Sequence, residues 1–420
     1  MKKIRLGEVA DVRISGVDKK TVPGELPIRL CNYTDVYYNW TIRPTMHDGF
    51  MVASAKEDEI TKFRLLAGQV VMTKDSETRD DIGHTAFVSS DFEDVILGYH
   101  CALISPQNGV LDGCYLNALF RTRHIADYLA RNAGGSGQRY YLSESAIRDV
   151  PLCLPPYDAQ LRIAGVLGSL DEKIALNRKK IAELGALAKT IYDYWFVQFD
   201  FPDKNGKPYK SSGGKMVWNE QLKCDVPKGW EIGNLSSLCT ISSSQCNPSR
   251  MDQTEIEHYS IPAFDAGVFP AFDAPQSILS NKFIVPKSAI LYSKLNAQFK
   301  RIWDPLHITE TPIASSEFVV YLPKENLYRG YIYAVLNDER FFGFANSISS
   351  CSTGSRKRFT PETTYRYALA IPPREILIAF SRQYSAMLES IRGLRMLIDS
   401  ATKQRDFLLP LLMNGQVVVK

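Results

Sequence analysis

The chain has 420 residues, of which 45% are hydrophobic and 23% charged, a composition typical of a folded protein of two to four domains. No apolar run reaches the roughly 18–20 residues that a membrane helix needs, and the start MKKIRLGEVADV lacks the apolar core of a signal peptide. We therefore expect a cytoplasmic protein with no membrane partner. The net charge of +4 is too small for bulk electrostatic coating of a partner, but basic residues gather locally in Lys287–Arg301 and Ser352–Arg366.

The cysteines and histidines give no sign of a metal site. The eight cysteines include no CxxC pair and the six histidines no HExxH motif, whereas zinc needs clustered ligands. We expect reduced, mostly buried thiols and no metal.

Residues 1–154 are predicted to form a first α/β domain. Val95–Pro106 has the composition of a strand, and the second half of Thr61–Lys74 carries another. Apolar residues in Gly113–Asn132 recur at helical spacing.

Residues 155–199 are predicted to contain a long helix, over Tyr157–Val197. Its apolar positions alternate between spacings of three and four, which is a heptad seam. The seam consists of Ile163, Leu167, Leu170, Ile174, Asn177, Ile181, Leu184, Ala188, Ile191 and Trp195. Asn177 interrupts the apolar stripe, and a single Asn at such a position commonly fixes register and partner orientation.

Residues 200–229 are predicted to be an exposed connector, because Gly, Pro, Ser and Lys dominate FPDKNGKPYKSSGGKMVWN. Residues 230–371 then form a second α/β domain. Leu235–Ile241 echoes Leu6–Val12, PKSAILYSK echoes AGQVVMTK, and EFVVYLP echoes HCALISP.

Residues 372–420 contain a second long helix, over Arg374–Asn414, and the C-terminal tail. The segment from Gly135 to Pro156 lies without a gap over Ser352 to Pro373, an offset of 217 residues. The same offset applied to the first seam gives Phe380, Tyr384, Met387, Ile391, Leu394, Ile398, Ala401, Arg405, Leu408 and Leu412. Only Arg405 departs from the apolar pattern, as a partner contact or a local break.

A repeat of half the chain predicts two similar units related by approximate two-fold symmetry. The alternative is two unrelated amphipathic helices packed on separate cores. About 40 residues of helix extend roughly 60 Å, so we expect the seams to meet as an antiparallel pair. The predicted fold is α/β (α+β), with two pseudo-symmetric globular domains separated by a long antiparallel two-helix coiled coil. Such a strut would act as a ruler, with DNA half-sites about 10 bp apart.

Two loops that follow strands are candidates for reading bases. TKDSETRDDIG (Thr73–Gly83) offers Lys74, Ser76, Glu77 and Arg79. Its acids favour base readout over phosphate binding, although a solvated acidic turn is the alternative. SKLNAQFKRIWD (Ser293–Asp304) has amides suited to adenine and cations suited to guanine or phosphate, although a basic surface hairpin is the alternative. The candidates in this second loop are Lys294, Asn296, Gln298, Lys300 and Arg301.

Two Gly/Ser-rich basic loops, GGSGQRYY and STGSRKRF, occupy matching places in the repeat. Small residues let the backbone approach an anion, so these loops are expected to contact phosphate. A helix-ending turn is the alternative. The candidate residues are Ser136, Gln138, Arg139, Tyr140, Ser352, Thr353, Ser355, Arg356 and Lys357.

Motifs for catalysis are missing from the sequence. There is no GxxxxGK[ST] loop for ATP, and LPPYD at Leu154–Asp158 has Leu where an amino-methyltransferase motif has its amine acceptor. Both Pro-Pro pairs are better interpreted as stops before the long helices. We predict no catalytic residue and no cofactor in this chain.

This layout resembles the specificity subunit of type I restriction–modification enzymes over the whole chain. The motifs that carry the resemblance are TKDSET..DIG, GSGQRYYLS, FDFPDKNGKPYKSSGGKMVWNEQLK, the P.GW opening of the second domain and RDFLLPLLMNGQV. The resemblance implies two target-recognition domains that read a split site on double-stranded DNA, one half each. It also implies that the paired helices dock two modification subunits, which use S-adenosylmethionine to methylate adenine. Restriction subunits driven by ATP and Mg²⁺ would join them. The alternatives are a stand-alone nuclease or methyltransferase and a coiled-coil scaffold with no nucleic-acid role.

Overall fold

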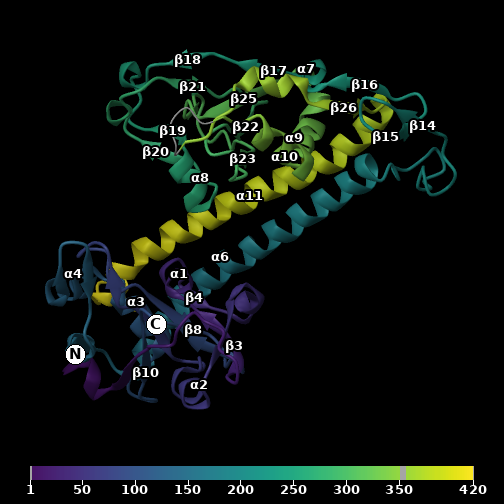
Figure 1. The fold of residues 1–420 in the computed structure, drawn as a ribbon. Coiled ribbons are helices and arrows are strands. Elements are labelled where there is room, and N and C mark those ends of the chain that lie inside the picture. Colours follow the sequence, from purple (N-terminus) through teal and green to yellow (C-terminus); the bar gives the residue numbers. More distant parts are fainter. Residues whose placement is uncertain (1, 351–355, 420) are drawn as a thin grey trace. The chain divides into compact units, whose positions relative to one another are not determined.

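The computed structural model describes residues 2–350 and 356–419. The chain divides into two compact units (Figure 1). The first unit comprises Met1–Ala175 together with Ser400–Lys420, and the second comprises Leu176–Asp399. Two long helices, α6 (Tyr157–Tyr192) and α11 (Arg374–Met413), pass from one unit into the other, so each unit contains part of both.

The first unit is built on a five-stranded sheet in the order β2-β10-β6-β8-β4. Its strands are β2 (Ala10–Ile14), β10 (Cys101–Pro106), β6 (Val70–Thr73), β8 (Thr85–Val88) and β4 (Thr41–Ile42). A second sheet has the order β5-β3-β9 and consists of β5 (Met51–Ala55), β3 (Leu26–Cys31) and β9 (Val95–Leu97). β1 (Lys2–Arg5) pairs with β13 (Pro151–Leu154) just before α6 begins. The shorter helices are α1 (Tyr33–Tyr37), α2 (Glu57–Phe63), α3 (Gly113–Phe120), α4 (Arg123–Asn132) and α5 (Glu144–Arg148).

The second unit repeats this plan. Its main sheet has the order β17-β25-β22-β23, with β17 (Cys239–Ser242), β25 (Phe318–Pro323), β22 (Ile290–Ser293) and β23 (Ile302–Trp303). A five-stranded sheet contains β18 (Gln245–Cys246), β21 (Lys282–Ile284), β24 (Ile313–Ala314), β19 (Ile256–Tyr259) and β20 (Ala271–Asp273). β16 (Glu231–Asn234) pairs with β26 (Ala368–Ile371) just before α11 begins. The shorter helices are α7 (Leu235–Leu238), α8 (Ile261–Gly267), α9 (Arg329–Asn337) and α10 (Glu339–Ser347).

The internal repeat predicted from the sequence is confirmed at the level of strand pairing. β2-β10-β6 in the first unit corresponds to β17-β25-β22 in the second, and all of these neighbours are antiparallel. The helix pair α3–α4 corresponds to α9–α10. Both long helices begin directly after a Pro-Pro pair, as predicted, because Pro lacks the N–H that a helix interior requires.

Two predicted elements are interrupted. Val95–Pro106 was predicted to be one strand, but it forms β9 and β10, which belong to different sheets. The chain turns between them at Gly98–His100, where His100 has a left-handed φ of 70°. Gly113–Asn132 was predicted to be one helix, but it breaks into α3 and α4 at Arg121, whose guanidinium donates to the backbone oxygens of Asn39 and Thr85.

Both predicted seams are the buried faces of their helices. Every seam position of α6 and α11, and Trp195 just beyond α6, is buried or half-buried. In the first unit, Ile163 and Leu167 share a core with Leu409 and Leu412. The start of α6 therefore lies beside the end of α11 in this unit.

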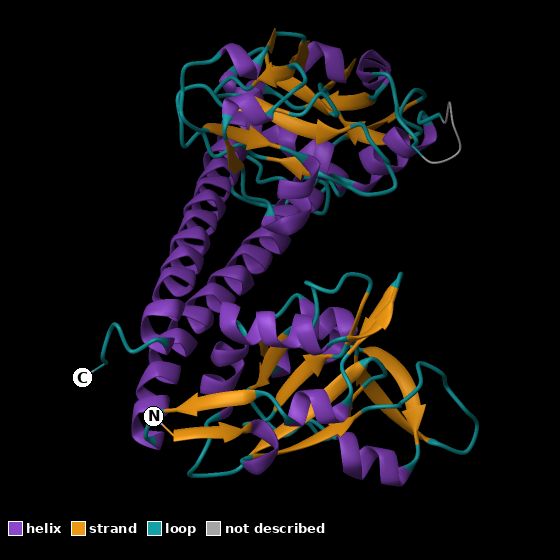
Figure 2. Ribbon diagram, turned by 90° about the vertical axis from the view of Figure 1, so that its left-hand side faces the viewer, coloured by secondary structure: helices purple, strands orange, loops and turns teal. Residues whose placement is uncertain are grey.

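The reverse pairing occurs in the second unit, where the end of α6 lies beside the start of α11. The Trp195 and Phe380 rings are 5.8 Å apart between centroids, and Phe380 stacks on Tyr384 at 4.8 Å. The two helices are antiparallel in each unit, and they lie side by side in both views (Figures 1 and 2). Asn177 is 5% exposed, and its amide Nδ2 has no hydrogen-bond partner among the described residues.

Arg405, the cation in the second seam, is an anchor within the first unit. Its guanidinium lies 4.3 Å from the Trp40 ring centroid and 3.8 Å from the Asp171 carboxylate on α6. Asp171 also binds Arg43 and accepts a hydrogen bond of 2.8 Å from Thr41. The charge is therefore paired, which is the condition under which a buried cation is tolerated.

The predicted exposed connector is partly wrong. Phe199 and Phe201 are buried and pack against Trp230, with ring centroids 5.5 and 5.3 Å apart. The Asp200 carboxylate accepts hydrogen bonds from the backbone N–H and hydroxyl of Ser211. A hairpin of β14 (Met216–Asn219) and β15 (Cys224–Pro227) completes the segment. Its aromatic residues contribute to the core of the second unit, and mainly its polar residues remain exposed.

The described cysteines are free thiols, less buried than expected. Cys31, Cys101 and Cys239 are buried, Cys153 is exposed, and the others are half-buried. Cys351 lies outside the described residues. No helix in residues 2–350 and 356–419 is long and apolar enough to cross a membrane.

We expect Phe380→Ala to destabilise the protein by about 3–5 kcal/mol, because it leaves a cavity where both helices meet the core of the second unit. Urea unfolding of the full chain measures this change. Met396→Ala on the same helix is the control, since that side chain is 49% exposed and should change stability by only about 0.5 kcal/mol. Equal effects of the two substitutions would contradict the assignment of this seam.

Candidate nucleic-acid interface

Two loops of the first unit, far apart in the sequence, form a single small sheet. β7 (Asp75–Ser76) from the acidic loop pairs with β12 (Arg139–Tyr141) from the Gly/Ser-rich loop, with Ser76 opposite Tyr140. β11 (Gly134–Ser136) completes the sheet in the order β11-β12-β7. The two candidate loops, which the sequence suggested separately, therefore make one surface.

Glycine makes the β11–β12 hairpin possible. Gly135 has a φ of 104°, and a Cβ there would lie 2.2 Å from the Arg139 carbonyl oxygen. Gly137 has a φ of 76° in the two-residue turn that it forms with Gln138. The turn leaves the side chains of Gln138 and Arg139 exposed.

The predicted residues of the first unit differ in how available they are. The Lys74 ammonium is 2.8 Å from the Asp75 carboxylate, and its side chain is only 15% exposed. Glu77 and Arg79 are exposed, and the Arg79 guanidinium lies 5.3 Å from the Tyr140 ring centroid. The Ser76 hydroxyl accepts a hydrogen bond from the backbone of Thr78. For Ser136, only its backbone place in β11 is described.

Beside this sheet is a cavity of about 570 Å³, which the sequence analysis did not predict. Its walls include six tyrosines: Tyr33, Tyr37, Tyr38, Tyr99, Tyr140 and Tyr141. Three of them come from the run CNYTDVYYNW, in and beside α1. The density of tyrosine in this run was the available signal, but nothing local indicated that it would face the two loops.

Charged groups lock the polar part of the cavity wall. The Asp75 carboxylate is held by Lys74 and, at 2.5 Å, by Nδ1 of His100. The Asp81 carboxylate accepts from the Tyr37 hydroxyl at 2.9 Å and contacts His84 Nε2 at 2.7 Å. These carboxylates are therefore fixed in place.

The tyrosines of the cavity keep their protons at neutral pH. Burial, assisted by the negative charge of Asp81, raises the pKa of Tyr33 to about 12. Burial also raises the pKa of Tyr37, as does its hydrogen bond to Asp81. The wall therefore presents neutral aromatic rings. No group of three or more metal-ligating side chains occurs in the part of the chain that the structure describes.

The second unit brings its two candidate loops together in the same way. Leu295 forms a bridge with Arg358, and the Asn296 N–H donates to the Lys357 carbonyl oxygen at 2.7 Å. Leu295 and Arg358 thus occupy the places that Asp75 and Tyr141 occupy in the first unit. Asn296 has a left-handed φ of 50°, and its side-chain Oδ1 is buried without a hydrogen-bond partner among the described residues.

Two predicted cations of the second unit are held by acids. The Arg301 guanidinium donates to both carboxylate oxygens of Asp265, at 2.7 and 2.8 Å, and is 13% exposed. The Lys300 ammonium lies 2.5 Å from Glu339. These ion pairs leave both cations less available to a ligand.

The remaining predicted residues of the second unit divide by exposure. Gln298, Arg356 and Lys357 are exposed, and Lys294 is half-buried. Ser352, Thr353 and Ser355 lie outside the described residues.

Glu317 and Arg358 were not predicted, but they tie the two loops of the second unit together. Arg358 donates to both carboxylate oxygens of Glu317, at 3.0 and 2.7 Å. The hydrogen bonds from Arg358 hold the pKa of Glu317 below its ordinary value of 4.5. The pair joins segments 41 residues apart, so no local sequence pattern could indicate it.

Two repeated α/β units, each with two loops joined into one surface and each sharing the same helix pair, define a protein with two recognition surfaces. Residues 1–186 match the family described as Type I restriction modification DNA specificity domain. Among curated relatives, the MjaIX specificity subunit of Methanocaldococcus jannaschii is 25% identical over 76% of this chain and 72% of that protein. The HindI specificity subunit of Haemophilus influenzae is 20% identical over 81% of this chain and 85% of that protein.

A solved structure shows the same fold over nearly the whole chain. The type I restriction–modification S subunit from M. genitalium superposes with a TM-score of 0.57 at 13% identity, covering 98% of this chain and 95% of that one. The family match and the relatives identify this chain as a type I restriction–modification specificity subunit.

We expect Glu317→Gln to destabilise the second unit at pH 7 and to have less effect in acid. A carboxyl whose pKa is lowered by folding stabilises the protein above its ordinary value of 4.5, and this contribution disappears as the pH falls through the lowered pKa. Thermal unfolding at several pH values measures the difference between the variant and the wild type. Glu310→Gln changes an exposed carboxyl in the same unit and serves as the control. A difference that is constant with pH would contradict this assignment.

Proposed function

We propose that each unit reads one half of a bipartite site on double-stranded DNA through the surface that its two joined loops form. The observation that carries the proposal is the repeated pairing, of Ser76 with Tyr140 in the first unit and of Leu295 with Arg358 in the second. A surface built twice from the same two segments suits two half-sites read in the same manner.

The exposed side chains on these surfaces have the chemistry for reading bases and binding phosphate. In the first unit, Glu77 can accept from an exocyclic amine, while Arg79 and Arg139 can bind guanine or phosphate. In the second, Gln298 can bind adenine, and Lys357 can neutralise phosphate. Lys300 and Arg301, held by acids, are better suited to fixing the shape of the loop.

As a specificity subunit, the chain catalyses nothing itself, and catalysis belongs to its partner subunits. We propose that two modification subunits dock on the outer faces of α6 and α11. Leu176 and Leu187 on α6 and Met396 and Phe407 on α11 are exposed apolar side chains, although these helices are otherwise polar outside their seams. We also propose that restriction subunits join this complex, and that it works in the cytoplasm.

The spacer between the half-sites is proposed to depend on the length of the long helices. α6 has 36 residues and α11 has 40, which correspond to roughly 54 and 60 Å of helix at 1.5 Å per residue. A pair of continuous helices would fix how many base pairs go unread, near one turn of DNA between half-site centres.

We expect that replacing residues 1–154 with the matching segment of another specificity subunit changes only one half of the recognised sequence. Methylome sequencing of cells that contain the partner subunits would show the new half, with the other half and the spacer unchanged. Exchange of residues 230–371 is the matched experiment and should change the other half. If either exchange altered both halves, the division of reading between the units would be wrong.

We expect Lys357→Ala to weaken binding of the assembled methyltransferase to DNA of any sequence and to lower the salt slope of binding by about 1. Lys357 is exposed on the joined loops, so its loss should remove one phosphate contact. Binding titrations at several salt concentrations measure the slope. Lys223→Ala removes a lysine that pairs with Glu220 at 2.9 Å in the β14–β15 hairpin, and it should leave the slope unchanged. An unchanged slope for Lys357→Ala would exclude this residue from the interface.

A further inference from the structure

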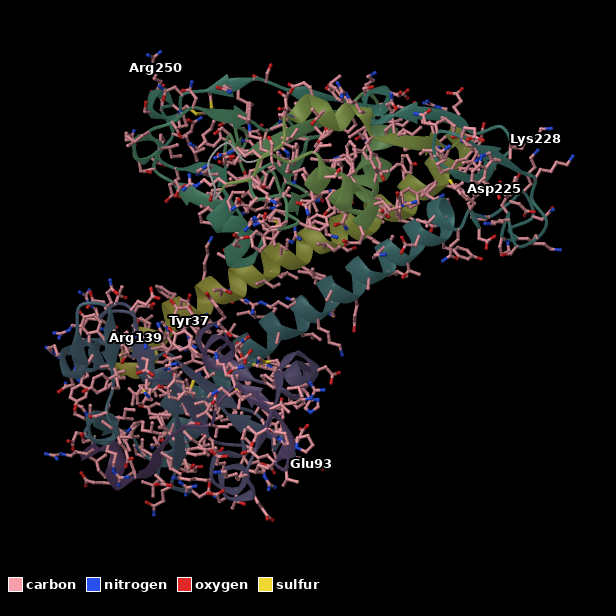
Figure 3. The ribbon with its side chains drawn as sticks, viewed as in Figure 1. Tyr37, Glu93, Arg139, Asp225, Lys228 and Arg250 are labelled. Atoms are coloured by element: carbon pink, nitrogen blue, oxygen red, sulfur yellow. The ribbon has the colours of Figure 1, made fainter. Side chains whose placement is uncertain are left out.

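The cavity of the first unit has a role that contacts at the edges of stacked bases do not require. Its volume of about 570 Å³ lies within the roughly 300–1,000 Å³ that is typical of small-molecule sites. It is lined by residues of both joined loops, including Ser76, Glu77 and Arg139, and by the tyrosines of α1. Figure 3 shows Tyr37 and Arg139 near each other, on a different side of the unit from Glu93. A ligand in the cavity would therefore touch the surface proposed to read DNA.

We propose that the first unit draws one base of its half-site out of the duplex and holds it in this tyrosine-lined cavity. The inference rests on the proposed function, and it adds an extrahelical base to reading in the groove. It concerns a base that is recognised, and not the adenine that the modification subunits methylate.

The walls of the cavity suit a flat aromatic ligand. Tyr33 and Tyr37 are stacked, with ring centroids 5.6 Å apart and 24° between their planes. Tyr38, Tyr99 and Tyr141 are 73%, 45% and 49% exposed, so their rings are open to a ligand. Stacking of a base on an aromatic side chain contributes about 1–3 kcal/mol, and extracting a base from a duplex costs a few kcal/mol. Two or three such rings can therefore offset the cost of extraction.

The polar groups favour a base with an exocyclic amine. Asp75 and Asp81 are already bound by Lys74, His100, Tyr37 and His84. Glu77 lines the same cavity and is exposed, so its carboxylate can accept from the amino group of adenine or cytosine. At the opposite loop, Arg139 is exposed and can bind the phosphate of the displaced nucleotide.

The second unit differs at the corresponding place, which confines the inference to the first. The Lys74 N–H donates to the His100 carbonyl oxygen, as the Lys294 N–H does to that of Glu317. Glu317 therefore replaces His100, and Arg358 replaces Tyr141. Where the first unit has two residues that line the cavity, the second has an ion pair with N···O contacts of 2.7 and 3.0 Å.

The test is a mismatch scan with the assembled methyltransferase. At each position of the recognised site the readable base is kept, and its partner is changed to one that cannot pair with it. A base that must leave the duplex costs less to extract when it is unpaired, so binding should tighten by about tenfold at one position of the half-site read by the first unit. Positions that the modification subunits methylate are left out, because those subunits extract their own target. The half-site read by the second unit is the internal control and should show no such gain.

Variants then assign the gain to the cavity. The double substitution Tyr99→Ala and Tyr141→Ala should abolish the gain and keep the preference for the remaining bases. Val52→Ala, at a 62% exposed position of the same unit that does not line the cavity, should keep the gain. Glu77→Gln should reduce the gain, because an amide replaces the carboxylate acceptor.

The outcomes separate this inference from the proposed function. If the intact site is bound specifically but no mismatch outside the methylated positions tightens binding, the extrahelical base is overturned and two-part reading stands. A gain that survives in the Tyr99→Ala, Tyr141→Ala variant also overturns it. If no sequence is bound specifically by the assembled complex, the proposed function itself fails.

Discussion

Burial of the two helix seams is the interaction on which the rest of the structure depends. The core of the first unit takes Ile163 and Leu167 from α6 and Leu409, Leu412 and Met413 from α11. The core of the second unit takes residues from the opposite ends of the same helices. Because each core needs side chains from both helices, neither unit is completed by one continuous segment of the sequence. The position of each reading surface is thereby tied to the helices that both units share.

Much of this architecture could be predicted from the sequence, because it is written in local periodicity. A seam with alternating spacings of three and four must form one face of a helix, and two seams at a common offset indicate a repeat. The strands β6 and β22 and the strands β10 and β25 were found by the same comparison. The buried aromatic residues of the connector were missed because Gly, Ser and Lys around them dominate its composition. Phe201 is buried only because Trp230, 29 residues later, returns to meet it.

The candidate site could be predicted in part, as four loops, but not as two surfaces. Pairing of β7 with β12 joins segments more than 60 residues apart, and no periodic pattern reports such a contact. The same limit applies to charge. Arg301 and Lys300 look free in the sequence, yet Asp265 and Glu339, which are 36 and 39 residues away, neutralise them. Availability of a cation is a property of the folded chain, and the sequence supplies only its identity.

The contribution of the last residues to the first core has a consequence for synthesis. Leu409, Leu412 and Met413 leave the ribosome only when nearly the whole protein has been made. At roughly 5–20 residues per second, more than 200 residues separate the end of the first unit's leading segment from these side chains, a delay of about 10–50 s. During that interval the nascent chain carries an unfinished apolar face, which chaperones recognise. Completion of translation, and not emergence of the first domain, therefore sets the moment at which the first reader becomes fully folded.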